Sequence, residues 1–153
     1  MEKYTAADIK ALREETGAGM MDCKKALEES DGDMEKAREW VRKRGLAKAE
    51  KKADRETKEG YVAVYAHNNN KVAAMVEILC ETDYVARNPE FQEMARSVAM
   101  QVVSMDPENV EELLKQEFIK NPDQTIEELV KSLSGKIGEK FVINRFVRYS
   151  VGE

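Results

Sequence analysis

The chain has 153 residues, carries a formal net charge of −5, and is 42% hydrophobic and 36% charged. This length allows one medium domain or two small ones, and the acidic balance disfavours wholesale coating of nucleic acid. No apolar run approaches the roughly 20 residues that cross a bilayer, and the N-terminus shows no signal-peptide pattern. The two cysteines, Cys23 and Cys80, match neither a metal spacing nor a disulfide framework. We therefore expect a cytoplasmic protein that makes no membrane contact and uses no cofactor.

The first helix is expected to begin after Thr5, a suitable N-cap with Asp8 in the capping-box position three residues later. Apolar residues at helical spacing continue to about Thr16. Gly17-Ala18-Gly19 then predicts a tight turn, because glycine adopts backbone conformations that other residues avoid. A second amphipathic helix follows, with its charged residues on the outer face.

The stretch Ser30-Asp31-Gly32-Asp33 indicates the end of the second helix and the cap of a third. Gly45 is expected to close the third helix. These helices predict a module over residues 1–46, which is near the lower size limit for a self-standing core. We expect Leu27 and Trp40 at its centre.

Met20 and Met21 are adjacent, so they cannot face the same way on a helix. In one interpretation, one of them belongs to the core while the other is exposed beside the Gly17–Gly19 turn and contacts a partner protein. Methionine suits such a role because it adapts to irregular surfaces. In the alternative, both methionines fill gaps in the small core.

Residues 42–58 hold eight Lys and Arg against three acids, with interspersed alanines and no aromatic residue. An RNA-binding stripe is one interpretation, but the aromatic groups that stack on bases are missing, and we expect no direct nucleic-acid contact. The pattern favours a solvated linker helix. We assign residues 47–59 as a basic linker between two domains.

Residues 60–153 are expected to form an α+β core domain. Residues 61–66 and 71–80 have strand composition, and the asparagine-rich turn between them predicts a hairpin. Residues 141–151 read as a third strand that pairs with this hairpin. The fold class is therefore α+β: a three-helix module, a linker helix, and a small antiparallel three-stranded sheet packed with helices.

Helices are expected to fill the space between the hairpin and the last strand. Asn88 caps and Pro89 opens the longest of them, and Asp106-Pro107 stops it. Two shorter helices follow, separated by Asn121-Pro122. Their apolar positions are Val110, Leu113, Leu114 and Phe118 in the first and Ile126, Leu129, Val130 and Leu133 in the second.

Residues 81–88 set a carboxylate and an aromatic ring, Asp83 and Tyr84, where a strand gives way to a helix. Such corners are held at both ends while their side chains remain free to meet a partner, and aromatic side chains are strong interface anchors. The alternative is an ordinary strand-end turn, in which Asp83 caps the turn and Tyr84 packs into its own core.

No glycine-rich phosphate-binding loop and no nucleophile elbow occurs in the sequence. His67, the single histidine, is expected to be a solvated turn residue rather than a catalytic base. The residue patterns therefore predict no enzyme, and by themselves they lead only to a protein-binding module.

Three stretches together resemble the bacterial elongation factor Ts family. Leu12 to Leu27 resembles its N-terminal signature, and Cys80 to Asn88 resembles its second signature, a cysteine followed by an acid or amide and then Thr-Asp-Phe-Val. Residues 136–149 are similar to its C-terminal stretch. Two long motifs at the right separation are a far more specific signal than one short motif.

The resemblance implies a guanine-nucleotide exchange factor for elongation factor Tu, with an N-terminal module like a ubiquitin-associated (UBA) domain. Family members insert an Asp-Phe pair near the magnesium site of the GTPase, which dislodges Mg²⁺ and releases GDP so that GTP can bind. By this resemblance the wedge falls on Asp83 and Tyr84, framed by Thr82 and Val85. The contacts of the N-terminal module fall on Arg13, Met20 and Met21.

The chain departs from the family pattern in two ways. Tyr84 stands where phenylalanine is usual, and the region between Met105 and Gly135 has no room for the second core copy or coiled-coil hairpin of many relatives. Single-core members of the family are thought to pair through their sheets, which implies a possible homodimer. The competing hypothesis is a generic binding module that uses only its UBA-like domain.

Overall fold

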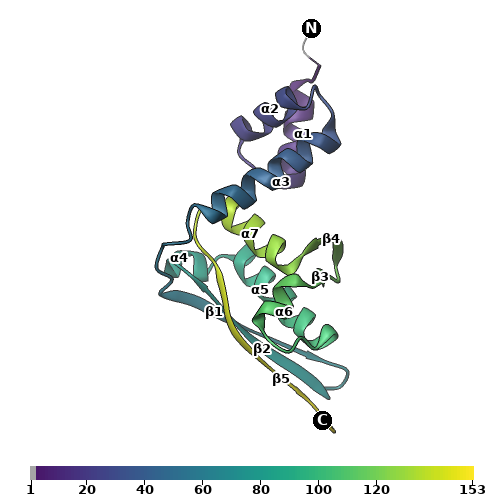
Figure 1. Ribbon diagram of the computed structural model, residues 1–153, viewed down its shortest axis with the longest axis vertical. Coiled ribbons are helices and arrows are strands. Elements are labelled where there is room, and N and C mark those ends of the chain that lie inside the picture. The colour runs from purple at the N-terminus through teal and green to yellow at the C-terminus, as the bar shows by residue number, and fades with distance from the viewer. Residues whose placement is uncertain (1–2) are drawn as a thin grey trace.

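The computed structural model describes residues 3–153, with the backbone alone for residues 49 and 50. Figure 1 shows three helices at one end of an elongated molecule and a helix-covered sheet at the other, which confirms the predicted α+β class. The first part contains α1 (Ala6–Thr16), α2 (Met20–Glu29) and α3 (Met34–Glu50). The second part contains β1 (Glu59–His67), β2 (Val72–Cys80), α4 (Asp83–Ala86), α5 (Pro89–Met105), α6 (Val110–Lys115), β3 (Glu117–Phe118), β4 (Asn121–Thr125), α7 (Ile126–Ile137) and β5 (Val142–Ser150).

The N-terminal helices begin and end largely where the sequence predicts. Thr5 caps α1 in a complete capping box with Asp8, and Gly17 closes it in the left-handed conformation at φ 70°. The core of this module consists of the fully buried residues Leu12, Cys23, Ala26, Leu27 and Ala37. Trp40 is only partly buried at the edge, because its indole N–H donates to the Glu29 carboxylate at 2.6 Å. The expectation that Trp40 is central was therefore wrong, whereas Leu27 is central.

The third helix does not end at Gly45. Instead, α3 continues to Glu50 and crosses α7, so the first four residues of the expected linker belong to this helix. The expected linker helix is wrong for residues 51–58, which form turns and irregular structure before β1 begins at Glu59. At the crossing a Cβ atom added to Gly135 would lie 2.5 Å from the carbonyl oxygen of Gly45. Glycine serves here for close approach of two helix backbones rather than as a helix stop.

The sheet has the order β1-β2-β5 with both pairings antiparallel, as predicted. The β1–β2 turn contains Asn68, Asn69 and Asn70, all with positive φ, which confirms the expected role of the asparagines. β5 pairs with β2 and carries one extra residue, Asn144, between the partners of Glu77 and Ile78.

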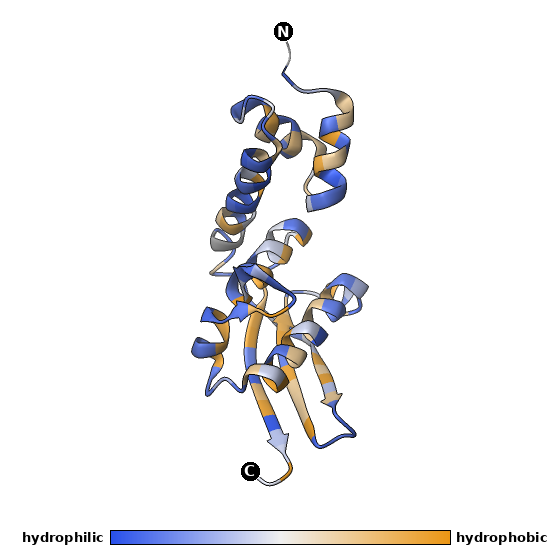
Figure 2. Cartoon of the chain, turned by 90° about the vertical axis from the view of Figure 1, so that its right-hand side faces the viewer, coloured by the Kyte–Doolittle hydropathy of each residue, from blue (hydrophilic) through white to orange (hydrophobic). Residues whose placement is uncertain are grey.

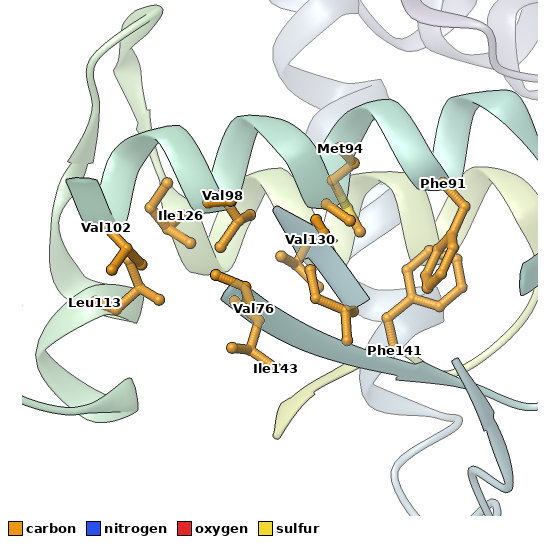
Figure 3. Close-up of a cluster of buried hydrophobic side chains, with 14 of the residues drawn as sticks. Val76, Phe91, Met94, Val98, Val102, Leu113, Ile126, Val130, Phe141 and Ile143 are labelled. Carbon is orange, nitrogen blue, oxygen red and sulfur yellow. The ribbon is translucent and has the colours of Figure 1, made fainter. Parts of the chain in front are cut away.

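The helices α5, α6 and α7 cover one face of this sheet. Asn88 caps α5 and Pro89 opens it, as expected. Figure 3 shows apolar side chains from α5, α7 and the sheet filling the space between the layers. Among them, the rings of Phe91 and Phe141 meet edge to face with centroids 4.8 Å apart, which joins the start of α5 to the segment before β5.

The segment after α6 differs from the prediction. The helix ends at Lys115, and Phe118 instead belongs to β3, which pairs with β4 in a small ribbon. Gln101 of α5 explains this change, because its buried amide donates to the carbonyl of Glu117 at 3.0 Å and accepts from the N–H of Ile119 at 3.0 Å. The buried amide thus draws the chain into an extended conformation.

Candidate protein-binding site

A single helical turn, α4, carries the exposed acid and ring of the candidate site. Thr82 caps this turn, and its hydroxyl oxygen accepts from the N–H of Val85 at 3.3 Å. Val85 and Ala86 are buried in the sheet core, whereas Tyr84 is 79% exposed. The alternative in which Asp83 caps the turn and Tyr84 packs inside is therefore wrong. The turn instead presents Tyr84 outward.

Asp83 lies beside Tyr84 on the solvent side of the turn. Its carboxylate pairs with Arg87 one helical turn later, at 2.9 Å, and both side chains are largely exposed. An exposed pair of this kind contributes little to stability. Asp83 is thus free to exchange this partner for one on another protein.

The end of α7 holds this corner through a pair of reciprocal carboxylates. Glu139 accepts from the N–H of Glu81 at 3.1 Å, and from the N–H and hydroxyl of Thr82 at 3.0 and 2.7 Å. Glu81 in turn accepts from the N–H of Lys140 at 2.8 Å. Sequence reasoning assigned no role to these two acids, although both lie in stretches that carry the family resemblance.

Cys80, at the end of β2, completes the underside of the corner. Its thiol is buried and donates to the carbonyl of Thr82 at 3.3 Å. Burial raises the pKa of the Cys80 thiol to about 11, and the nearby Glu139 carboxylate acts in the same direction. The group therefore stays a neutral thiol near pH 7 and serves packing rather than reactivity.

The second candidate surface lies at the start of α2. Met20 and Met21 are 58% and 74% exposed, so both interpretations that buried one or both of them were wrong. The buried face of α2 is formed by Cys23, Ala26 and Leu27 instead. Arg13 is also exposed, in the last turn of α1 before the glycine turn.

Lys136 of α7 connects the two surfaces. Its ammonium group pairs with Glu90, at the start of α5, at 2.6 Å. The same side chain covers Gly17, where an added Cβ would lie 2.4 Å from its Cε. The Lys136 side chain thus lies between the turn that precedes Met20 and the start of α5, the helix that follows the Tyr84 turn.

The basic segment after the module is engaged rather than free in solvent. Lys52 is 8% exposed and donates to the carbonyl of Ser134 at 3.2 Å, and its burial lowers its pKa. Arg55 donates to the carbonyl of Gly138 at 3.1 Å, and Arg42 pairs with Glu39 and Glu128. These contacts join α3 and the residues after it to α7.

The outer face of the sheet is a third surface. Helices cover only the other face (Figure 1), and Figure 2 shows that its strands are rich in hydrophobic residues. We call this surface the open face. Its apolar residues include Val62, Val64, Met75, Val147 and Tyr149. Glu77 and Arg145 lie on the same face and form an ion pair at 3.2 Å. Four of these apolar side chains are between 47% and 75% exposed, which is a large apolar patch for a monomer.

Within residues 3–153, no helix is long and apolar enough to cross a bilayer. The same residues contain no cluster of three or more His, Cys, Asp or Glu side chains arranged to hold a metal ion.

Known proteins resemble the chain along its whole length. A sequence model of the family described as Elongation factor TS matches residues 81–153. A protein of Moorella thermoacetica named Elongation factor Ts is 42% identical over 193 aligned positions, covering 97% of this chain and 95% of that protein. The Elongation factor Ts of Aquifex aeolicus is 50% identical over 147 positions, covering 93% of this chain and 51% of that protein. The first alignment is longer than this chain, so that relative carries residues without a counterpart here.

Proposed function

The chain belongs to the elongation factor Ts family, the nucleotide exchange factors for elongation factor Tu in translation elongation, and from this premise we propose that Asp83 and Tyr84 are its wedge. The protein acts on a GTPase and has no bond chemistry of its own. The observation that carries the proposal is the 79% exposure of Tyr84 on a turn whose next two residues are buried. A bulky ring on so short a turn suits insertion into a pocket of a partner.

The wedge works through the partner's magnesium ion. In GTPases Mg²⁺ bridges the nucleotide phosphates and the protein. A carboxylate and a ring pushed between the elements that bear the ion would displace it and weaken the hold on GDP, so that GTP can bind. Exchange factor and nucleotide then lower each other's affinity reciprocally. A thousandfold weakening requires about 4 kcal/mol of coupling.

Two groups of residues support the wedge. Thr82 and Val85 frame it, one as the cap of the turn and the other as its buried anchor. Arg13, Met20 and Met21 dock the N-terminal module on the nucleotide domain of the GTPase, and their exposure beside the Gly17 turn favours this role. Exposed methionines suit such a contact because they adapt to the shape of a partner.

We propose a corresponding division of the chain into residues 1–46 as the UBA-like module, 47–59 as the linker and 60–153 as the core domain, with the end of α3 in the linker. We assign the action of the protein to the cytoplasm, where translation takes place. The partner is elongation factor Tu, and we infer no direct contact with nucleic acid or membrane.

The test is release of a fluorescent GDP analogue from bacterial elongation factor Tu. We expect strong acceleration by the natural protein and its loss when Asp83 and Tyr84 are both replaced by Ala. Replacement of Met20 and Met21 by Ala should raise the half-saturating concentration, and Met105→Ala, an exposed methionine at the end of α5, is the matched control.

Two outcomes would redirect the proposal. Acceleration that survives loss of Asp83 and Tyr84 would keep the function and move the wedge elsewhere, first to the N-terminal module. No acceleration by the folded natural protein, tested on the GTPase of its own source, would leave the generic binding module as the remaining hypothesis.

We further propose that two copies pair through the open face. Two such faces would bury Val64, Met75 and Val147 of each copy against one another, and apolar area removed from water favours association. Cys23 and Cys80 are both buried in their own cores, so the pairing rests on packing and not on a disulfide.

A further inference from the structure

We propose that Glu139 is a positioning residue that holds the Asp83–Tyr84 turn in its binding-competent conformation. The inference rests on the proposed function of that turn. Glu139 contacts neither Asp83 nor Tyr84 by any hydrogen bond of the described residues. It acts instead on the two residues before them, Glu81 and Thr82.

The geometry joins Glu139 to the turn by a continuous chain of hydrogen bonds. One carboxylate oxygen accepts from two successive backbone N–H groups, those of Glu81 and Thr82, which lie just beyond the last residue of β2. The other accepts from the Thr82 hydroxyl at 2.7 Å, while that hydroxyl accepts from the Val85 N–H at 3.3 Å. A carboxylate that accepts three such bonds forms stronger contacts than a neutral acceptor would.

Hydrogen bonds of Glu139 and of the next residue hold Glu139 in place. Its carbonyl oxygen accepts from the hydroxyl of Ser134 in the last turn of α7, at 2.5 Å, and the next residue, Lys140, donates its N–H to Glu81. Arg55 lies close to the two acids and donates to Glu81 at 3.4 Å and to Gly138 at 3.1 Å. Two carboxylates at one corner are thus balanced by a cation and by backbone N–H groups.

This arrangement has a consequence for binding. The turn is four residues long and far too short to be stable as an isolated helix. Without an acceptor for the N–H groups of Glu81 and Thr82, the turn would sample other conformations, and a partner would have to order it on binding. Residues held in the bound conformation beforehand avoid that loss of affinity and rate.

The experiment compares Glu139→Ala and Glu139→Gln with the natural protein in GDP-analogue release and in amide hydrogen exchange. Glutamine keeps the size of the side chain but cannot accept all three bonds, so it tests the idea if the alanine variant fails to fold. Glu127→Gln is the matched control, because Glu127 lies on α7, loses the same charge and, among the described residues, forms an ion pair only with Lys131, at 3.0 Å.

We expect Glu139→Ala to lower the maximal exchange rate roughly tenfold, on the scale of one hydrogen bond to a charged group. The amides of Ala86 and Arg87, which donate to Thr82 and Asp83 within the turn, should exchange faster with solvent. The melting temperature should fall by a few degrees, because three hydrogen bonds to the carboxylate are lost, whereas amide exchange at the start of α2 should be little affected. In a background that already lacks Asp83 and Tyr84, Glu139→Ala should have no further effect on GDP release, because it acts through them.

Two results would overturn the inference. One is normal GDP release by the folded Glu139 variants when the variant lacking Asp83 and Tyr84 is impaired. The other is an effect of Glu139→Ala that remains equally large in the absence of Asp83 and Tyr84. Full activity of the protein lacking Asp83 and Tyr84 would instead overturn the proposed site. Amide exchange would then still report separately whether Glu139 orders the turn.

Discussion

Tyr84 and Val85 are neighbours in one helical turn but face opposite environments. Tyr84 is 79% exposed, whereas Val85 is 4% exposed and packs in the sheet core. A residue that contributes nothing to its own core and presents a large ring to water is suited to a partner. The two positions therefore allow binding and stability to be changed separately.

Replacing Tyr84 should alter exchange without altering stability. Tyr84→Ala is expected to change the free energy of unfolding by less than about 0.5 kcal/mol, as is usual for exposed sites, and to reduce exchange by tenfold or more. Tyr84→Phe should leave exchange unchanged or modestly changed, since only the hydroxyl is lost. Urea unfolding and GDP-analogue release are the measurements.

Val85→Ala is the contrasting substitution, because Val85 is buried, and it should lower the free energy of unfolding by about 2 kcal/mol. A large gain in exchange by Tyr84→Phe would show that the hydroxyl obstructs insertion.

Glu15 should make the N-terminal module acid-sensitive. Arg38 of α3 donates to its carboxylate through Nε at 2.5 Å and Nη2 at 3.3 Å, and this hydrogen bonding lowers the pKa of Glu15 below its usual 4.5. A carboxyl whose pKa falls on folding stabilises the folded state above the unfolded pKa. That contribution disappears as pH falls through the folded pKa. The pair is half-exposed, so added salt should weaken it as well.

The check is thermal unfolding of the natural protein and Glu15→Gln at pH 7, 5 and 3. We expect a lower melting temperature for the variant at pH 7 and a difference that shrinks toward zero at pH 3. Glu14→Gln is the matched control, because the neighbouring Glu14 meets Lys10 only at 3.9 Å. A difference that stays constant from pH 7 to pH 3 would contradict the assignment to the Arg38 contact.

Caps and turns could be predicted from the sequence, whereas the direction in which a helix side chain faces could not. The cap at Thr5, the asparagine turn and the Pro89 start follow from backbone preferences that act within a few residues. Whether Met20 faces the core depends on which side of α2 the other helices occupy. Trp40 lies at the module edge for a similar reason, since its N–H requires a polar partner that the core does not offer.

Among the elements, α3 and α7 make the contact that joins the two parts of the molecule. Their backbones approach at Gly45 and Gly135, and Lys52 donates to Ser134 near the same crossing. A sequence that places glycine late in a helix predicts a helix end, which is how Gly45 was interpreted. The same residue at a crossing allows close packing, and only the partner helix distinguishes the two cases.

The two glycines of this crossing should respond oppositely to alanine. A Cβ at Gly135 would meet the Gly45 carbonyl oxygen at 2.5 Å and its Cα at 2.8 Å, so the helices must separate. We expect Gly135→Ala to cost about 1–3 kcal/mol, as overpacking does. A Cβ at Gly45 meets Ser132 only at 3.9 Å, an ordinary contact. Gly45→Ala should be neutral or stabilise by up to about 1 kcal/mol, because alanine favours helix interiors.

Urea denaturation of both variants measures these changes in the free energy of unfolding. The separation of the helices should also move the N-terminal module relative to the core, and Gly135→Ala should therefore raise the half-saturating concentration in GDP-analogue release. Equal effects of the two substitutions on stability would show that the crossing is not as tight as described.

The β3–β4 ribbon was the element that sequence patterns missed. Its sequence contains Asn121-Pro122, which locally favours a break, and β3 is only two residues long. The ribbon forms because Gln101, sixteen residues before Glu117 and near the C-terminal end of α5, offers both a donor and an acceptor to the backbone around Glu117. Such a long-range hydrogen bond leaves no hydrophobic pattern in the sequence of the segment that it holds in an extended conformation.

For the whole molecule, the sheet is covered on one side only. α5, α6 and α7 pack on the inner face, while Val62, Val64 and Met75 remain exposed on the open face. Strand composition predicted the sheet but not which face would be covered, because residues on both faces are apolar. The open face is the surface that the proposed homodimer would bury.

The last prediction concerns the mass of the protein in solution. We expect light scattering at micromolar concentration to give about twice the 17.4 kDa of one chain. Met75 lies on the central strand, opposite Val64 and Val147, so it is at the middle of the open face. Met75→Glu should give a monomer, because two buried, unpaired carboxylates would face each other across the interface. Its folded structure should persist, since Met75 is already 47% exposed.

Met105→Glu is the matched control, because Met105 is 48% exposed at the end of α5, away from the open face. The same chemical change there should leave the mass of the dimer unaltered. A natural protein with the mass of one chain at micromolar concentration would contradict the pairing. A dimer that tolerates Met75→Glu would assign the contact to another surface. If the monomeric variant still accelerates GDP release, one copy contains the complete wedge, and the dimer serves to cover apolar surface rather than to build the site.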